Sequence, residues 1–229
     1  IHHLCFREDI SMNLILLGLP GSGKGTHAKK LNKKYKMYHL SSGKLIRKAA
    51  RQNTSIGTVA RRYLNKGKLV PDKIVVKLIR EKIIKFQGKD YIFDGFPRNL
   101  DQVQILENIL QGIKQRIDLC IYLKVAEDNL IIRLSGRRIC SYCGSIYHVK
   151  FNPPQKKGIC DNCGGNLLQR VDDKVNIVKK RLEENREKTN KLINYYQNKE
   201  ILETVIGTDK TPEEVQQEID SIVEQFDLP

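Results

Sequence analysis

Short apolar runs alternate along the chain with segments in which apolar residues recur every three or four positions. Three of the runs are almost uninterrupted, namely NLILLGL (13–19), DYIFD (90–94) and LCIYLKV (119–125). Continuous apolar runs of this length are typical of strands that are buried on both faces of a parallel sheet. The pattern therefore predicts an α/β fold with a central parallel sheet. Cys120, inside the third run, is expected to pack as a small apolar core residue.

The segments between the runs predict amphipathic helices. One begins near Pro71, because Pro-Asp is typical of a helix start, and its apolar positions fall on one helical face: Ile74, Val75, Leu78, Ile79, Ile83 and Phe86. Segments 101–113 and 172–197 show the same period. The latter begins with two aspartates, which we expect in its first helical turn.

A glycine-rich stretch, GLPGSGKGT (18–26), follows the first expected strand and precedes a helical segment. Its form, G-x-x-x-x-G-K, lets the backbone turn closely around a phosphate group, and amide N–H groups with the helix N-terminus supply positive potential. We interpret it as a phosphate-binding loop, with a structural glycine turn as the alternative. The candidate ATP-binding residues are Gly21, Ser22, Gly23, Lys24, Gly25 and Thr26, among which Lys24 would reach the β- and γ-phosphates.

Gly25 stands where many such loops carry a metal-binding hydroxyl. Thr26, or an acid elsewhere in the chain, must therefore organise Mg²⁺.

Two Cys-x-x-Cys pairs, Cys140 with Cys143 and Cys160 with Cys163, form the pattern C-x2-C-x16-C-x2-C. Four thiolates at this spacing suit tetrahedral Zn²⁺ in a structural site. Iron in place of zinc, or two disulfides, are the alternatives. The surrounding residues include Gly, Pro and Asn clusters with little helical period, which indicates a small insertion.

Composition limits the class of protein. The chain has 229 residues, of which 40% are hydrophobic and 29% charged, so a disordered or fibrous protein is excluded. The formal net charge of +15 has two explanations. One is an anionic partner such as nucleic acid, a lipid surface or phosphorylated small molecules; the other is a general lysine surplus on solvated helix faces.

No apolar run approaches the length of a membrane span, and the N-terminal residues lack the apolar core of a secretory signal. We therefore expect no membrane association and a cytoplasmic, reducing location, in which disulfides are disfavoured. Residues 1–11 precede Met12, carry no recognisable motif and are treated as a leader of unknown role.

The stretch GLPGSGKGT, together with DGFPR (94–98), resembles the nucleoside monophosphate kinases, and the adenylate kinase family in particular. The resemblance extends from Met12 to about Glu224, and the cysteine segment resembles the zinc-bearing lid of the long-type members. It implies a P-loop NTPase three-layer fold. The implied division is a core domain (12–40, 71–135 and 174–229), a small helical NMP-binding domain (41–70) and a zinc-binding lid domain (136–173).

The resemblance also implies the residues of two nucleotide sites. Those for AMP are Ser42, Arg47, Lys68, Leu69, Val70, Gly95, Phe96, Pro97, Arg98, Gln102, Arg170 and Arg181. Those for ATP, beyond the phosphate loop, are Arg133, Arg137, Ile146, Tyr147 and Asp209. The implied catalytic residues are Lys24, Arg98, Arg133, Arg137, Arg170 and Arg181, which would position and neutralise the transferring phosphoryl group. Asp94 would hold Mg²⁺ through water, and His148 would form hydrogen bonds in the lid.

Some positions depart from the family pattern. In SSGKLIR (41–47), Lys44 replaces the usual aspartate, so the contribution of that acid to the metal-water shell or to a lid contact is not carried over. In VIGTDK (205–210), Ile206 and Asp209 replace the usual aspartate and lysine, and only a backbone role is expected of Asp209. Gln102 matches an adenine-reading glutamine, but its amide could also flip to suit guanine.

The resemblance implies reversible transfer of the γ-phosphoryl group of Mg·ATP to AMP, giving two ADP, by a monomer that maintains adenine nucleotide balance. The alternatives within the enzyme class are a kinase for another nucleoside monophosphate and a GTP:AMP phosphotransferase. From another class, the alternative is a zinc-ribbon nucleic-acid-binding NTPase. We expect no nucleic-acid partner, because YHVKFNPP (147–154) is not an interleaved basic and aromatic face and a ribbon would leave the flanking arginines unexplained.

Overall fold

The structure is a computed structural model, and it describes residues 12–66 and 68–226. Within these residues, five parallel strands form the central sheet in the order β2-β3-β1-β4-β8. They are β1 (Leu14–Leu17), β2 (Tyr38–Ser41), β3 (Tyr91–Asp94), β4 (Leu119–Lys124) and β8 (Leu202–Ile206). The predicted parallel sheet and its three apolar strands are confirmed. The prediction of a leader at residues 1–11 lies outside the described residues.

The two strands that the apolar pattern did not predict, β2 and β8, are the edges of the sheet. In β8 only Val205 is buried, and in β2 only Leu40 and Ser41 are buried. An edge strand of this kind does not require a continuous apolar run, because less of it is covered by neighbouring elements.

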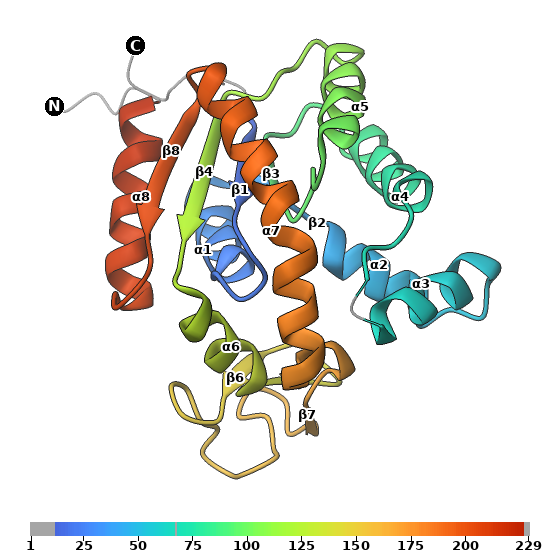
Figure 1. Ribbon diagram of the computed structural model, residues 1–229, viewed down its shortest axis with the longest axis vertical. Coiled ribbons are helices and arrows are strands. Elements are labelled where there is room, and N and C mark those ends of the chain that lie inside the picture. Colours follow the sequence, from blue (N-terminus) through green and yellow to red (C-terminus); the bar gives the residue numbers. More distant parts are fainter. Residues whose placement is uncertain (1–11, 67, 227–229) are drawn as a thin grey trace, which may run out of the picture.

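Helices cover both faces of the sheet (Figure 1). One face carries α1 (Lys24–Tyr35) and α8 (Pro212–Phe226), and the other carries α4 (Asp72–Lys85), α5 (Leu100–Gln111) and α7 (Val175–Asn198). Residues of β1 alternate between the two apolar clusters, with Leu14 and Leu16 on the side of α1 and α8, and Ile15 and Leu17 on the other. Every residue of β1 is buried for this reason, and the three-layer arrangement is confirmed.

The predicted core positions behave as expected. In α4, Val75, Ile79 and Ile83 are buried against the sheet, and Cys120 in β4 is fully buried. No helix within 12–66 or 68–226 combines the length and the apolar character needed to cross a bilayer.

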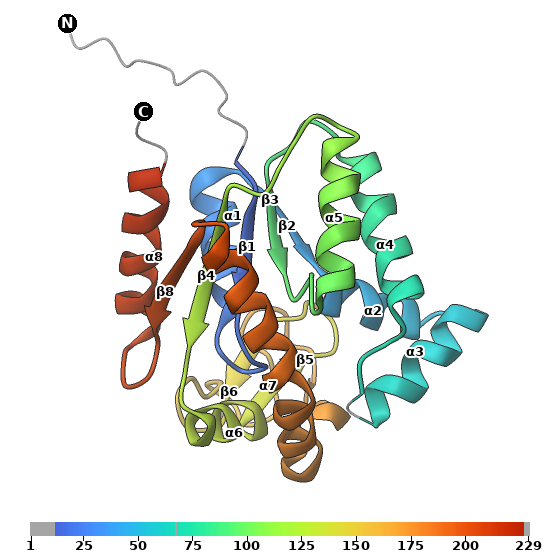
Figure 2. The same ribbon diagram turned by 45° about the horizontal axis from the view of Figure 1, so that its top comes forward.

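Two inserted segments project from this core. Between β2 and α4, the helices α2 (Ser42–Ala50) and α3 (Ser55–Asn65) pack against each other to one side of the molecule (Figure 2). The hydroxyl of Thr54 accepts the N–H of Gly57 at 3.0 Å and caps the start of α3.

The second inserted segment lies between α6 (Glu127–Ser135) and α7. It forms an antiparallel sheet of β5 (Arg137–Cys140), β6 (Ile146–His148) and β7 (Leu167–Leu168), in the order β6-β5-β7. Its buried cluster contains Cys140, Tyr147 and Cys160, with Leu167 partly buried. Such a small apolar cluster contributes little to folding stability, so the segment needs another source of it.

The expectation for Asp172 and Asp173 was wrong. They lie in a 3₁₀ turn, η1 (Val171–Asp173), and α7 begins only at Val175 with no acid in its first turn. Both aspartates are buried, and their carboxylates pair with arginines rather than with the N-terminus of the helix. Local helix signals did not reveal these distant ion pairs.

Candidate active site

The loop after β1 leads into α1 at the carboxyl edge of the sheet, which is where open α/β sheets bind their ligands. Gly18 has a φ of 145° and Gly23, the residue before α1, has a φ of 100°. A Cβ on Gly18 would lie 2.8 Å from the carbonyl oxygen of Leu123 in β4, so a side chain does not fit there. The loop therefore turns directly into the N-terminus of α1, a suitable place for a phosphate group.

Lys24 is the first residue of α1, and its ammonium group points back into the loop. Its Nζ donates hydrogen bonds to the carbonyl oxygens of Gly18 at 2.7 Å and Leu19 at 2.9 Å. Burial lowers the pKa of Lys24 to about 7, although the charge of Asp94 opposes the shift. A phosphate beside this ammonium would stabilise its charged form.

Asp94 ends β3 against the phosphate loop. A Cβ on Gly25 would lie 3.3 Å from Oδ2 of Asp94. Burial by itself would raise the pKa of Asp94, but the hydrogen bond with His39 Nε2, at 3.1 Å, and the charge of Lys24 lower it to about 2. An ionised carboxylate next to a phosphate loop could hold Mg²⁺ through water, in the region where Gly25 offers no hydroxyl.

Lys44, which departs from the family pattern, extends this arrangement. Its Nζ lies 3.5 Å from Nδ1 of His39, whose Nε2 faces Asp94. Because an ammonium can only donate, His39 accepts at Nδ1 and donates its Nε2–H to the carboxylate. Lys44 therefore supports the charge of Asp94 through His39.

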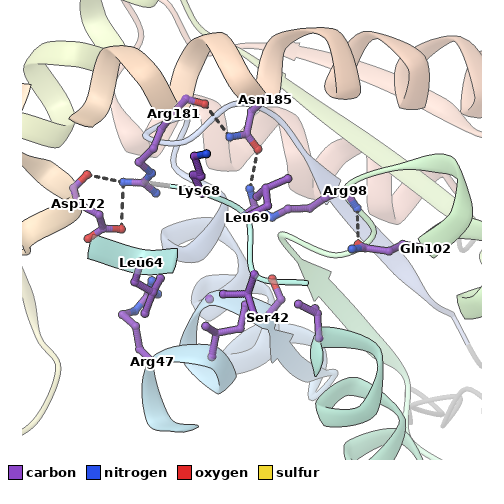
Figure 3. Close-up of a pocket in the computed structure, with 14 residues that line it drawn as sticks. Ser42, Arg47, Leu64, Lys68, Leu69, Arg98, Gln102, Asp172, Arg181 and Asn185 are labelled. Atoms are coloured by element: carbon purple, nitrogen blue, oxygen red, sulfur yellow. Dashed lines mark hydrogen bonds and ion pairs between the residues drawn. The ribbon is translucent and has the colours of Figure 1, made fainter. Parts of the chain in front are cut away.

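A pocket opens beside α2 and α7 (Figure 3). It brings together most of the residues expected to bind AMP, namely Ser42, Arg47, Lys68, Leu69, Val70, Arg98, Gln102 and Arg181. Gly95, Phe96, Pro97 and Arg170 do not line it, and the ring of Phe96 is buried in the apolar cluster with α4 and α5. The pocket is thus assembled from segments that are far apart in the sequence.

Arg98 is held in a single orientation in this pocket (Figure 3). Its Nε donates to the carbonyl oxygen of Gly95 at 2.8 Å, and its Nη1 donates to Oδ1 of Asn185 at 2.9 Å. Burial lowers the pKa of Arg98 to about 10, which leaves the guanidinium charged near neutral pH. The pocket therefore contains a fixed cation.

The amide of Gln102 is also oriented by the protein. Its Oε1 accepts the backbone N–H of Arg98 at 2.8 Å, and its Nε2 donates to Oδ1 of Asp72 at 2.7 Å. Each end of the amide has one partner, and each keeps capacity for one more. The reading of a base by Gln102 stays a prediction.

Two buried aspartates of η1 orient arginines next to the pocket. Nε of Arg137 donates to Oδ2 of Asp173 at 2.8 Å, and a second bond from the same guanidinium reaches Oδ1. Nη1 of Arg181 lies 3.1 Å from Oδ2 of Asp172 and 3.5 Å from Oδ1 of Asp173. These pairs fix both guanidinium groups without neutralising the whole cluster, because further arginines lie nearby.

Arg47 and Arg170 complete the cluster. Burial, together with the charges of Arg47 and Arg137, lowers the pKa of Arg170 to about 9. Burial likewise lowers the pKa of Arg47, with Arg137 and Arg181 acting in the same direction. An excess of buried positive charge of this kind is suited to an anionic ligand such as a phosphoryl group.

Arg133 and Asp209, both expected at the ATP site, lie close to each other. Nη2 of Arg133 donates to the carbonyl oxygen of Gly207 at 2.9 Å. Burial lowers the pKa of Arg133, and the charge of Asp209 opposes the shift. Neither residue lines the pocket of Figure 3, so the structure separates them from the residues expected to bind AMP.

The four paired cysteines come together in the second inserted segment. Their sulfur atoms all lie within 4.8 Å of one another, with Cys140 and Cys163 at 3.4 Å and Cys143 and Cys160 at 3.6 Å. Each pair closes a tight turn, in which Gly144 N–H donates to the carbonyl oxygen of Cys140 and Gly164 N–H donates to the carbonyl oxygen of Cys160. Four sulfurs at these separations fit a single tetrahedral Zn²⁺, for which Zn–S distances are about 2.3 Å.

Neighbouring residues of this segment have different environments. Ile146 is 38% exposed, whereas Tyr147 is buried. Nε2 of His148 lies 3.1 Å from the carbonyl oxygen of Ile132 in α6, and its Nδ1 accepts the backbone N–H groups of Lys150 and Phe151. The expected hydrogen-bonding role of His148 is confirmed.

Sequence reasoning missed the residues that orient the functional groups: His39, Asp172, Asp173 and Asn185. One signal was available for Asn185, since it follows Arg181 by one helical turn and so shares a face of α7 with it. The pairing of Asp173 with Arg137 joins residues on opposite sides of the cysteine segment, and no local pattern indicates it.

Comparisons with known proteins identify the family of the chain. The sequence profile of the family described as adenylate kinase matches residues 16–201. An adenylate kinase of Oceanobacillus iheyensis is 44% identical over 215 residues, which cover 93% of this chain and 100% of the relative. One from Geobacillus sp. is 45% identical over 197 residues, covering 86% and 91%, and one from Caldicellulosiruptor saccharolyticus is 43% identical over 200 residues, covering 87% and 93%. The chain therefore belongs to the adenylate kinase family.

Proposed function

We propose that this chain is an ATP:AMP phosphotransferase, which transfers the γ-phosphoryl group of Mg·ATP to AMP and reverses the reaction with two ADP. The observation that supports the proposal best is the arginine cluster at the pocket of Figure 3. The phosphate loop lies near this cluster, since the charges of Arg98, Arg137 and Arg181 help to lower the pKa of Lys24. Family membership supports the same activity.

In this proposal the phosphate loop, Gly21 to Thr26, holds the phosphates of ATP, and Arg133 and the backbone of Asp209 lie near the rest of the nucleotide. Ile146 and Tyr147 are assigned to the ATP side by resemblance alone. The residues that line the pocket bind AMP, and Arg98 contacts its phosphate as a fixed cation. Gly95, Phe96 and Pro97 keep a backbone role beside the acceptor.

The chemistry requires charge and position more than proton transfer. The acceptor phosphate is already an anionic nucleophile, so no general base is needed. Lys24, Arg98, Arg133, Arg137, Arg170 and Arg181 would neutralise the equatorial oxygens of the transferring group as negative charge develops on them. Asp94 would hold Mg²⁺ through water, and the ion would neutralise negative charge on the phosphates of ATP.

The domain division belongs to the proposal as well. Residues 41–70 would bind the monophosphate, residues 136–173 would form a zinc-bearing lid over ATP, and 12–40, 71–135 and 174–229 would form the core. A lid of this kind excludes water, so that the γ-phosphoryl group of ATP is transferred to AMP rather than to water. We propose that the chain acts as a monomer and without a nucleic-acid partner.

A coupled assay with AMP, GMP, CMP and UMP as acceptors, and with ATP or GTP as donor, tests the substrate assignment. We expect ATP with AMP to give the highest kcat/KM. A better acceptor than AMP would favour another nucleoside monophosphate kinase, and a preference for GTP would favour a GTP:AMP phosphotransferase. Tight, steeply salt-dependent binding of DNA or RNA without phosphoryl transfer would replace the kinase assignment by a nucleic-acid-binding one.

A matched pair of variants tests the role of Arg98. Arg98→Ala should lower kcat/KM for AMP by about 100-fold or more, because a buried cation is lost from the acceptor phosphate. Arg80→Ala, on the exposed side of α4, removes the same type of side chain away from the pocket and should leave the activity unchanged. Equal activity of the two variants would contradict the assignment of Arg98.

A further inference from the structure

Tyr147 lies against the cysteine cluster rather than on the surface of the segment. Its side chain is on β6, is 8% exposed, and belongs to the same buried cluster as Cys140 and Cys160. Its hydroxyl oxygen lies 3.5 Å from Sγ of Cys160. The only tyrosine between the cysteines of the first pair, Tyr142, is by contrast 88% exposed.

A second contact determines the direction of the hydrogen bond. The hydroxyl oxygen of Tyr147 accepts the backbone N–H of Asp161 at 2.9 Å. A cysteine bound to a metal is a thiolate, which can accept a hydrogen bond but has no proton to donate. The phenol proton is therefore directed to the sulfur, and the hydroxyl accepts with its lone pair and donates with its proton.

This network joins the two cysteine pairs. Tyr147 is paired with Arg138 in the β5–β6 ladder, and β5 ends at Cys140 of the first pair. Its hydroxyl reaches Cys160 and Asp161, which belong to the second pair and its turn. Cys160 is 1% exposed, so the hydrogen bond is shielded from water, which strengthens it.

We propose that Tyr147 is a positioning residue of the metal site: its hydroxyl donates to the Cys160 thiolate, stabilises the charge of that ligand and holds the second cysteine pair against β6, and so slows the release of the metal. This inference rests on the proposed zinc site. In this proposal the hydroxyl of Tyr147 binds a metal ligand, so only the backbone and ring of Tyr147 remain for contact with a nucleotide.

Ser145 provides an internal comparison. Its Oγ lies 3.1 Å from Sγ of Cys143, but that cysteine is exposed, and water competes for the sulfur. A hydrogen bond to an exposed thiolate should contribute less than one to a buried thiolate. We therefore expect removal of the Tyr147 hydroxyl to weaken metal retention more than removal of the Ser145 hydroxyl.

The test uses the full chain loaded with Zn²⁺ and follows the transfer of zinc to a chromogenic chelator. Loss of a ligand's hydrogen-bond partner typically costs 10- to 100-fold in metal affinity. We expect Tyr147→Phe to release zinc about 10-fold faster than the unchanged chain, Ser145→Ala to release it less than about 3-fold faster, and Tyr142→Phe to match the unchanged chain. Phenylalanine keeps the buried ring, so packing is preserved.

Cobalt substitution separates a hydrogen bond from a merely structural effect. In Tyr147→Phe the thiolate-to-Co²⁺ charge-transfer band should move to lower energy, because a thiolate without its hydrogen bond is a better electron donor; Tyr142→Phe should leave the band in place. Equal zinc release and an unmoved band in Tyr147→Phe would overturn the proposal for Tyr147. Failure of the unchanged chain to retain zinc or cobalt would instead overturn the zinc site itself.

Discussion

Asn185 connects the acceptor pocket to the long helix α7. Its Oδ1 accepts the hydrogen bond from Arg98 Nη1 at 2.9 Å, and its Nδ2 donates to the carbonyl oxygen of Arg181 at 2.6 Å, one turn earlier (Figure 3). With only 5% of its surface exposed, the amide has no access to alternative partners in bulk water. A neutral amide, anchored to the backbone of α7, thus orients Arg98, one of the arginines assigned to catalysis.

Asn185→Leu should therefore impair phosphoryl transfer. The change leaves Nη1 of the buried Arg98 guanidinium without its acceptor, and hydrogen bonds to charged groups contribute about 1.5–3 kcal/mol, or roughly 10- to 100-fold. We expect kcat/KM for AMP to fall by that factor and the KM for ATP to change little. Asn190→Leu, at an exposed position of the same helix, is the control and should retain the original kinetics. Equal kinetics in both variants would show that Arg98 does not depend on Asn185.

Lys24 predicts a pH dependence of ATP binding. Burial lowers its pKa to about 7 in the free protein, and bound phosphates must raise it again. Above pH 7 the free ammonium loses its proton, so ATP binding should take up a proton and weaken by up to about tenfold for each pH unit. Below pH 7 the group is already protonated, and this dependence should disappear.

Calorimetry between pH 7.5 and 9, in two buffers with different ionisation enthalpies, measures the number of protons taken up. The phosphates of ATP are already ionised in this range, so the uptake reports on the protein. Lys24→Arg supplies the control, because a guanidinium stays charged and should abolish the uptake. ATP affinity that is constant from pH 6.5 to 9 would contradict a lowered pKa of Lys24.

At the scale of secondary structure, sequence patterns predicted the elements that neighbouring elements bury in a regular way along their length. β1, β3 and β4 lie between two helical layers and therefore read as continuous apolar runs, and the buried face of α4 was correct to the residue for Val75, Ile79 and Ile83. The edge strands β2 and β8 were missed because each is only partly covered. The start of α7 was misplaced, since the buried ion pairs of Asp172 and Asp173 outweigh the local preference for acids at a helix N-terminus.

The residues of the candidate site also divide into those that a local pattern could predict and those that it could not. The phosphate loop and the cysteine pairs are local motifs that could be predicted from their own residues, whereas the arginines were implied only by the resemblance to the adenylate kinase family. Their partners come from elsewhere in the chain, and His39, Asp173 and Asn185 became visible only in three dimensions.

Asp173→Asn tests whether η1 is held by its ion pairs. The carboxylate is fully buried against Arg137 and Arg181, so removing its charge leaves Arg137 without its counter-ion and Arg181 with Asp172 alone. Breaking one side of a buried pair typically costs about 3–5 kcal/mol, which urea unfolding would measure. Asp128→Asn, at an exposed position in the first turn of α6, should cost less than about 1 kcal/mol. A similar small cost for both variants would mean that water, and not Asp173, compensates the arginines.

At the scale of the whole molecule, stability is distributed unevenly. The central sheet is held between two large apolar clusters, whereas the segment around the cysteines has a buried cluster of Cys140, Tyr147 and Cys160 alone, with Leu167 at its side. We therefore expect the three-stranded sheet β6-β5-β7 to depend on the proposed zinc, while the phosphate loop is anchored in the sheet. Such a difference would let the proposed lid move without disturbing the core.

Removal of zinc by a chelator should consequently lower the thermal midpoint and unfold the cysteine segment first. The free energy of zinc binding at a closed Cys₄ site also stabilises the fold of the residues around it. Its loss should therefore destabilise mainly residues 137–168. In amide hydrogen exchange, β5, β6 and β7 should lose protection in the metal-free protein, and β1 and β4 should keep theirs. Readdition of Zn²⁺ should restore both the midpoint and the protection. An unchanged thermal midpoint in a sample verified to be metal-free would show that the segment folds without the metal, and protection lost equally from β1 would show that the metal stabilises the molecule as a single cooperative unit.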